Sequence, residues 1–229
     1  MSGIKEKITK AFKVDLDSEE NQNILKPSAR PFKAHQVDGV AKKIYELIED
    51  AKHSNDDIIL NHSEIKEAFF SPFKPQLKNA QVFLSYSHAD KNKALKVKNY
   101  LESETNHRVF IDSLFWDYKD NVLNELARYD NTSKIKDAFT LILRESLQDM
   151  IEKCPYFVFL QSNNSVSNQG LSRTTYSAWI YEELKIAHSI RESRLTPMTE
   201  SWQVSHDILP FLESLETITL KELSRIINS

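Results

Sequence analysis

Residues 80–90 read AQVFLSYSHAD, a short apolar run that ends in small polar residues. Such a run predicts a buried strand that leads into a polar turn. Four further elements alternate after it: a helix from Asp90 to Glu102, a strand at RVFID (108–112), a helix from about Ser133 to Lys153, and a strand at YFVFLQS (156–162). This βαβαβ order predicts an α/β fold with a parallel sheet covered by helices on both faces.

Parallel sheets bind ligands beyond the carboxyl ends of their strands, at the point where the strand order reverses. A polar cluster follows each of the three predicted strands: Ser85 to Asp90, Asp112 to Asp117, and Gln161 to Ser167. We therefore expect the functional site among these three clusters.

The segments on either side of these strands complete the predicted organisation. Residues 1–77 are expected to form a helical extension, and residues 78–229 the α/β domain. The extension is predicted to contain an amphipathic helix from Gly3 to Phe12, a polar loop from Asp15 to Pro31, a helix from Val37 to Ala51, and a helix capped by Asn61 and Glu64. The end of the chain is predicted to contain a helix over TYSAWIYEELKIAHSI (175–190), a strand near Glu216 to Thr219, and a helix from Leu220 to Ile227.

The composition of the chain shows which general classes of protein it can belong to. The 229 residues are 40% hydrophobic and 28% charged, with a formal net charge of −3, which is typical of a globular protein and does not favour nucleic acid as the main partner. The single cysteine, Cys154, indicates neither a disulfide nor a Cys-rich zinc site. The sequence has no apolar run typical of a signal peptide or a membrane span, so we expect a cytoplasmic protein without a membrane partner.

Several familiar kinds of site are not supported. With three glycines in the chain, neither a P-loop nor a GxGxxG turn can be written. The seven histidines have no spacing suited to a metal, and no serine lies in a GxSxG motif. A receiver domain would share the sheet, but its acidic pair is replaced here by SYSHAD. No metal or tightly bound cofactor is therefore expected.

The helix expected at 175–190 contains two adjacent glutamates whose positions differ. On a wheel of about 100° per residue, Glu183 lies near the middle of the apolar side and Glu182 lies on the polar side. Because burying an unpaired charge is costly, the carboxylate of Glu183 must be paired, neutral or exposed in a cleft. Glu182 is the natural control.

Three of these stretches together resemble the Toll/interleukin-1 receptor (TIR) domain family. VFLSYSHAD resembles its first-strand box, RVFID its second strand leading into the BB loop, and SAWIYEEL its S-x-W-x-x-x-E helix, over about residues 79 to 229. The FIDSLFWDYKD and WIYEE forms are most similar to bacterial antiphage TIR proteins of the Thoeris type. The resemblance implies a flavodoxin-like fold for this part of the chain.

The resemblance also implies an activity. In enzymatic TIR domains the glutamate four residues after the tryptophan is the catalytic residue of NAD cleavage. That position is Glu183 in this sequence. NAD would then be a substrate and not a cofactor, and seven residues would line the cleft: Tyr86, Ser87, Asp112, Ser113, Trp116, Ser177 and Trp179. For the aromatic residues the alternative role is core packing, and for Glu183 a buried salt bridge.

The family implies partners as well. The ADP-ribose part of NAD would be cyclised, or joined to a small acceptor, to make a signal for a separate effector protein in antiphage defence. TIR contacts would also support a homo-oligomer. The alternative function is a non-catalytic adaptor that signals through TIR–TIR assembly.

Overall fold

A computed structural model describes most of the chain, in these ranges: 10–25, 42–47, 49–50, 61–70, 79–111, 121–125, 127, 133–169, 172–175, 177–192 and 206–229. The chain divides into two compact units. The first consists of Met1–Arg30, Asn79–Asp112 and Leu147–Ser229, and the second of Pro31–Lys78 and Ser113–Ser146. The first unit contains the sheet.

Five strands form this sheet, and all of them are parallel, as predicted for the sheet. They are β1 (Lys10–Asp15), β2 (Ala80–Ser85), β3 (Arg108–Ile111), β4 (Tyr156–Gln161) and β8 (Glu216–Thr217), in the order β3-β2-β4-β1-β8. The order is compatible with the flavodoxin-like 2-1-3-4-5 arrangement, except that β1, the first strand described along the chain, lies in the fourth position.

Strand β1 corrects the expected character of the first 77 residues. The predicted helix from Gly3 to Phe12 is wrong for Lys10 to Phe12, because these residues begin a strand that pairs with both β4 and β8. Phe12, Val14 and Leu16 are fully or almost fully buried, so the apolar period here is two, as in a strand, and not the helical 3.6. The expected loop after Asp15 contains a short helix, α1 (Glu19–Ile24), which Ser18 caps.

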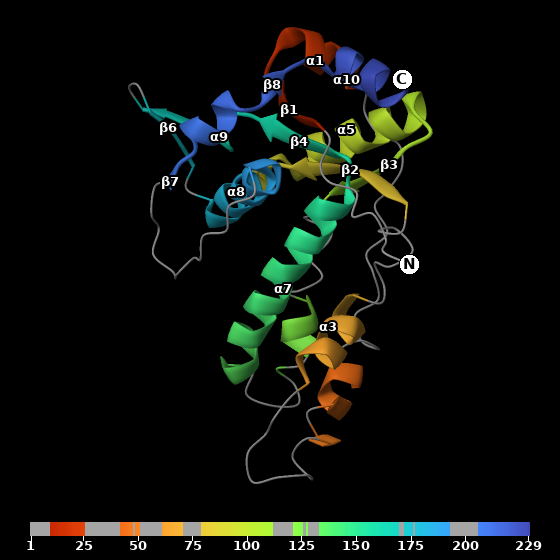
Figure 1. The fold of residues 1–229 in the computed structure, drawn as a ribbon, viewed down its shortest axis with the longest axis vertical. Coiled ribbons are helices and arrows are strands. Elements are labelled where there is room, and N and C mark those ends of the chain that lie inside the picture. The colour runs from red at the N-terminus through yellow and green to blue at the C-terminus, as the bar shows by residue number, and fades with distance from the viewer. Residues whose placement is uncertain are drawn as a thin grey trace. The chain divides into compact units, whose positions relative to one another are not determined.

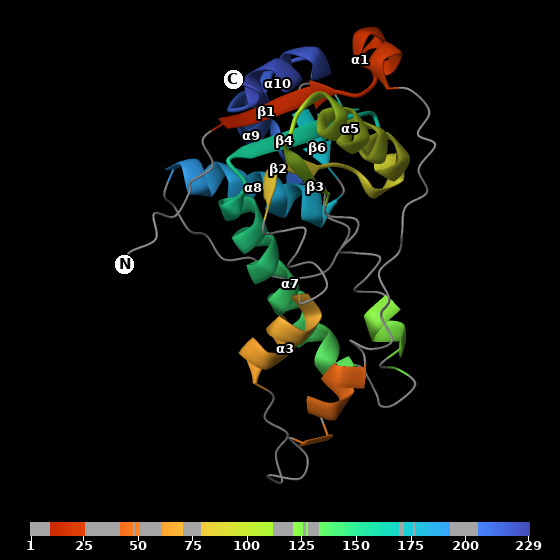
Figure 2. The same cartoon turned by 90° about the vertical axis from the view of Figure 1, so that its right-hand side faces the viewer.

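Helices cover both faces of the sheet (Figures 1 and 2). α5 (Lys91–Glu104), α10 (Leu220–Ile227) and α1 lie together on one face, and α8 (Ala178–Glu192) lies on the other, against β2. The remaining elements of this unit are η1 (His88–Asp90), α9 (Leu209–Glu213) and a small antiparallel sheet of β5 (Ser167–Gln169), β6 (Ser172–Thr175) and β7 (His206–Asp207). In the described part of the chain, no helix has the length and apolar character needed to cross a membrane.

Two further helices agree with the sequence predictions. α7 spans Ser133–Lys153, as expected, and the division between the two units falls within it. α3 (His62–Phe70) belongs to the second unit and begins where predicted, since the Asn61 side chain accepts from the backbone N–H groups of Ser63 and Glu64 at 3.0 and 3.3 Å.

The centre of the sheet is aromatic. Phe83 of β2 is in register with Phe110 of β3 and Phe157 of β4, and its ring stacks on both at 5.8 Å between centroids. Each such pair stabilises the sheet by about 1 kcal/mol beyond the area it buries. Because strand side chains alternate, Ser85, two residues after Phe83, points to the same face as this aromatic row.

Candidate functional site

The carboxyl ends of β2 and β4 meet at the centre of the sheet. From β2 the chain passes to β3 on one side, whereas β4 lies on the other side, so the strand order reverses between β2 and β4. This is the position where open α/β sheets bind ligands. The polar clusters after these two strands come together, as predicted. The third, Asp112 to Asp117, lies outside the described residues.

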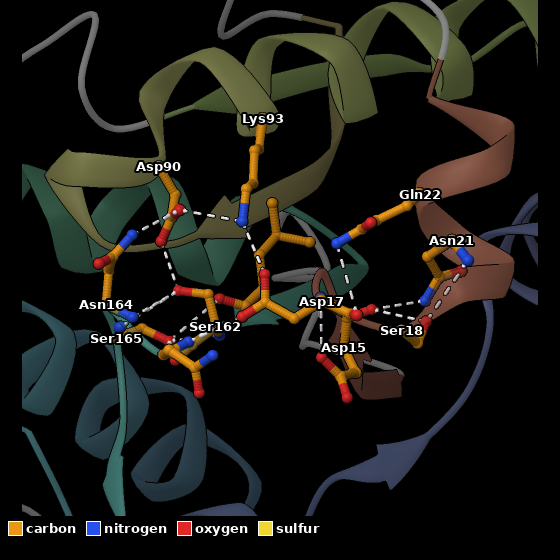
Figure 3. Close-up of polar contacts among 12 residues, drawn as sticks. Asp15, Asp17, Ser18, Asn21, Gln22, Asp90, Lys93, Ser162, Asn164 and Ser165 are labelled. Atoms are coloured by element: carbon orange, nitrogen blue, oxygen red, sulfur yellow. Dashed lines mark hydrogen bonds and ion pairs between the residues drawn. The ribbon is translucent and has the colours of Figure 1, made fainter.

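Asp90 is the centre of this junction (Figure 3). Its Oδ2 accepts from the hydroxyl of Ser162, and its Oδ1 accepts from Nδ2 of Asn164 at 2.9 Å. Nζ of Lys93, one turn into α5, lies 3.6 Å from Oδ1. Both carboxylate oxygens of this buried residue are therefore held by polar side chains from two different elements.

The loop after β4 forms a compact turn around Ser162. Its buried hydroxyl accepts from the backbone N–H groups of Asn164 and Ser165 at 3.1 and 3.2 Å, and its own N–H donates to Oγ of Ser165 at 2.8 Å. Ser162 thus connects the loop backbone to Asp90.

A second carboxylate connects the junction to β1. Nζ of Lys93 donates to Oδ1 of Asp17 at 2.7 Å, and the N–H of Asn163 donates to Oδ2 of Asp17 at 3.0 Å (Figure 3). The hydrogen bond from Lys93 is the main reason why the pKa of Asp17 is below its usual value, and the bond from Asn163 adds to this. The same bond to Asp17 raises the pKa of Lys93. Three strand ends, those of β1, β2 and β4, are joined in this way.

Glu183 lies at the same strand end as the junction, on the other side of β2. Helix α8 carries it against β2, where Oε2 accepts from the hydroxyl of Ser85 at 2.5 Å. Both side chains are fully buried, with a relative exposure of 0%. The predicted exposure of Glu183 in a cleft is therefore wrong for this structure. The carboxylate is hydrogen-bonded within the protein.

Glu182 is also buried, at 3% exposure, although it lies on the polar side of the helical wheel. Helix α9 covers that side. The ring of Phe211 lies edge-on to Tyr181 and to His188, at centroid distances of 5.6 and 5.3 Å. The helical wheel identified the polar side of α8 correctly, but the sequence did not show that α9 would pack against this side.

The other predicted site residues lie in the turn after β2, in the first turn of α8, or outside the described residues. Tyr86 is buried directly after Ser85, and the backbone oxygen of Ser87 accepts from the N–H of Asp90 at 2.7 Å. Ser177 accepts from the N–H of Ile180 at 3.3 Å, which caps α8, and Trp179 is half-buried in the first turn of α8. Asp112, Ser113 and Trp116 lie outside the described residues.

Cys154 lies away from this site. Its buried thiol donates to the carbonyl oxygen of Ala80, at the amino end of β2, over 3.7 Å. Burial raises the pKa of Cys154 to about 12, so the thiol is not a nucleophile at neutral pH. Among the described residues, no group of three or more histidine, cysteine or acidic side chains is arranged to hold a metal.

The sequence predictions missed several members of the junction: Asp17, Lys93, Ser162 and Asn164 as interacting residues, and Asp90 as their centre. Asp90, Ser162 and Asn164 lie within predicted clusters, so their proximity follows from the strand order. Asp17 had no such signal, because β1 was not recognised as a strand.

The chain matches no protein-family model, no curated protein and no solved structure.

Proposed function

We propose that the chain is a TIR-like enzyme that cleaves the bond between nicotinamide and ribose in NAD, with Glu183 as the catalytic residue. The observation that carries this proposal is the carboxylate of Glu183, held by Ser85 at the carboxyl end of β2 beside the reversal of strand order. The S-x-W-x-x-x-E pattern of Ser177, Trp179 and Glu183 on one helix supports it.

The chemistry needs one carboxylate. Ordinary glycosidases use a second carboxyl group to protonate a poor leaving group. Nicotinamide leaves NAD as a neutral molecule from a cationic pyridinium, so it needs no proton. The carbon–nitrogen bond breaks with both electrons going to nicotinamide, and positive charge develops on the ribose. A carboxylate away from bulk water stabilises that charge effectively.

A nucleophile then bonds to the ribose carbon and loses its proton. With water the product is ADP-ribose. With an atom of the same molecule it is a cyclic isomer, and with a small acceptor it is a conjugate. In this proposal Trp179, one turn before Glu183, would stack on a ring of the substrate.

The burial of Glu183 adds a requirement to the proposal. Because the carboxylate has no exposed surface, side chains that cover it must move when NAD binds. Activity would then depend on whatever favours the open arrangement, such as assembly of several copies or a cellular trigger. The product would act on a separate effector protein, as in the antiphage systems that the sequence resembles.

Nicotinamide release from NAD tests the proposal. We expect the wild-type protein to release nicotinamide, and the Glu183→Gln variant to be slower by at least about a hundredfold, since Gln keeps the shape but not the charge. Glu182→Gln is the matched control, because it makes the same change at a neighbouring buried carboxylate of the same helix. It should keep most of the activity.

Mass spectrometry should follow the NAD products both with purified protein at high concentration and in lysate of phage-infected cells, where a trigger or acceptor would be present. Equal losses in the Glu182 and Glu183 variants would rule out the assignment of Glu183. Wild-type protein with no turnover in either setting, but with stable self-association, would favour the non-catalytic adaptor.

A further inference from the structure

The hydroxyl of Ser85 is a buried polar group in an apolar setting. It lies at the end of β2, on the face that carries the row of Phe83, Phe110 and Phe157, and it is directly opposite Phe159 of β4 in the sheet register. A hydroxyl in such surroundings is costly to bury without a hydrogen bond. The 2.5 Å bond to Oε2 of Glu183 supplies one.

The backbone around Ser85 is firmly placed. β2 is paired on both sides, with β3 and β4, and the turn that follows Ser85 ends at Asp90, which is fixed by Ser162 and Asn164. A helical glutamate, by contrast, reaches its carboxylate through three rotatable bonds. The rigid partner in this pair is therefore Ser85, and the side chain it orients is Glu183.

We propose that Ser85 is a positioning residue, whose hydroxyl fixes the carboxylate of Glu183 in the orientation that serves the reaction. This proposal rests on the proposed function. A carboxylate is planar, so a bond to Oε2 from a fixed donor also limits the direction of Oε1. Catalysis depends strongly on such placement, because small displacements of a reacting group lower its rate considerably. Ser85 acts through Glu183 and does not contact NAD.

The KM and kcat of nicotinamide release separate this role from substrate binding. In Ser85→Ala we expect kcat to fall about tenfold, while KM changes by less than about twofold, because the effect is on the orientation of the catalytic carboxylate. The variant is first checked for a wild-type circular dichroism spectrum and cooperative unfolding.

A second pair of variants separates the hydroxyl from the packing. Ser85→Thr and Ser85→Val add nearly the same volume at this buried site, but Thr keeps the hydroxyl donor. We expect Thr to have a kcat at least about fivefold higher than Val, since it alone retains the bond to Glu183. If Ser85 acts only through packing, the two variants will have the same kcat.

The outcomes distinguish the two proposals. Wild-type turnover together with an unchanged kcat in Ser85→Ala, or equal kcat in Thr and Val, would overturn the role of Ser85 and leave Glu183 as the catalytic residue. No turnover by wild type would overturn the proposed function and this role with it. Turnover that depends on both Glu183 and the hydroxyl at position 85 would support both.

Discussion

Asp90 and Glu183 are two buried carboxylates at the carboxyl end of the same strand, and they differ in what holds them. Asp90 has polar side chains on both oxygens, supplied by the loop after β4 and by α5. Glu183 faces the end of an aromatic row, and its Oε2 is held by the neutral hydroxyl of Ser85.

The difference agrees with a structural role for Asp90 and with the catalytic role proposed for Glu183. A carboxylate that accepts from hydroxyl and amide groups and lies near an ammonium group holds its neighbours in place. Buried ionisable groups beside the point where the strand order of an α/β sheet reverses are candidates for function, which agrees with the role proposed for Glu183. Asp90 thus stabilises the fold that keeps Glu183 in position.

The largest expected effect on stability is at Asp90. Asp90→Asn places an amide group where Ser162 and Asn164 both donate, and it removes the attraction to Lys93. We therefore expect the free energy of unfolding to fall by about 2 kcal/mol. Glu183→Gln is the matched change and should alter stability by less than about 0.5 kcal/mol, because the carbonyl oxygen of Gln can still accept from the hydroxyl of Ser85. Urea unfolding of both variants measures this. The opposite ranking would contradict the assignment of the two roles.

A smaller effect is expected at Ser162. Ser162→Ala removes a donor to Asp90 and an acceptor for two backbone N–H groups, which should cost about 1 kcal/mol. Ser85→Ala is the comparable truncation, because it removes the hydroxyl of a buried serine at the end of β2. If Ser162 serves the junction and Ser85 serves Glu183, then Ser162→Ala will lower stability more and nicotinamide release less than Ser85→Ala does.

The smallest effect is expected at the partly exposed pair of Asp17 and Lys93. The folded pKa of Asp17 is lowered from 3.8, so its contribution to stability is present above that pH and is lost as the pH falls through the folded value. The folded pKa of Lys93 is raised from 10.5, so its contribution is present below that pH and is lost as the pH rises further.

Asp17→Asn should therefore lower the free energy of unfolding by about 0.5 kcal/mol at pH 7, after allowance for solvent screening. The difference from wild type should shrink as the pH falls from about 3.8 through the lower folded pKa of Asp17, because the carboxylate becomes protonated first in the unfolded state and then in the folded state. Chemical unfolding at pH 7 and at pH 3 measures both values. A difference that is the same at both pH values would show that the ion pair is not its origin.

The strands that could be predicted from the sequence are those that form short, uninterrupted apolar runs. QVFLSYS, RVFID and YFVFLQS are such runs, and the helices between and after them have clear apolar periods. Lys10–Asp15 is not such a run, because Lys13 interrupts its apolar residues, and its place between β4 and β8 became visible only from its pairing with them.

For the candidate site, the sequence indicated the strand-end clusters and the special position of Glu183. It favoured a cleft for Glu183 over burial, and it did not indicate the burial of Glu182, since Phe211 of α9 comes from an element distant in the chain. It also did not indicate that Ser85 is the partner of Glu183. Contacts between residues 98 positions apart depend on the assembled sheet.

The place of β1 in the sheet has a consequence for synthesis on the ribosome. Lys10 pairs with Tyr156, and Phe12 pairs with Glu216, so the strand is made long before either neighbour exists. At about 5–20 residues per second, an apolar segment then waits for several seconds or longer without its partners. The sheet is complete only after β8 emerges, so its folding is completed late in synthesis.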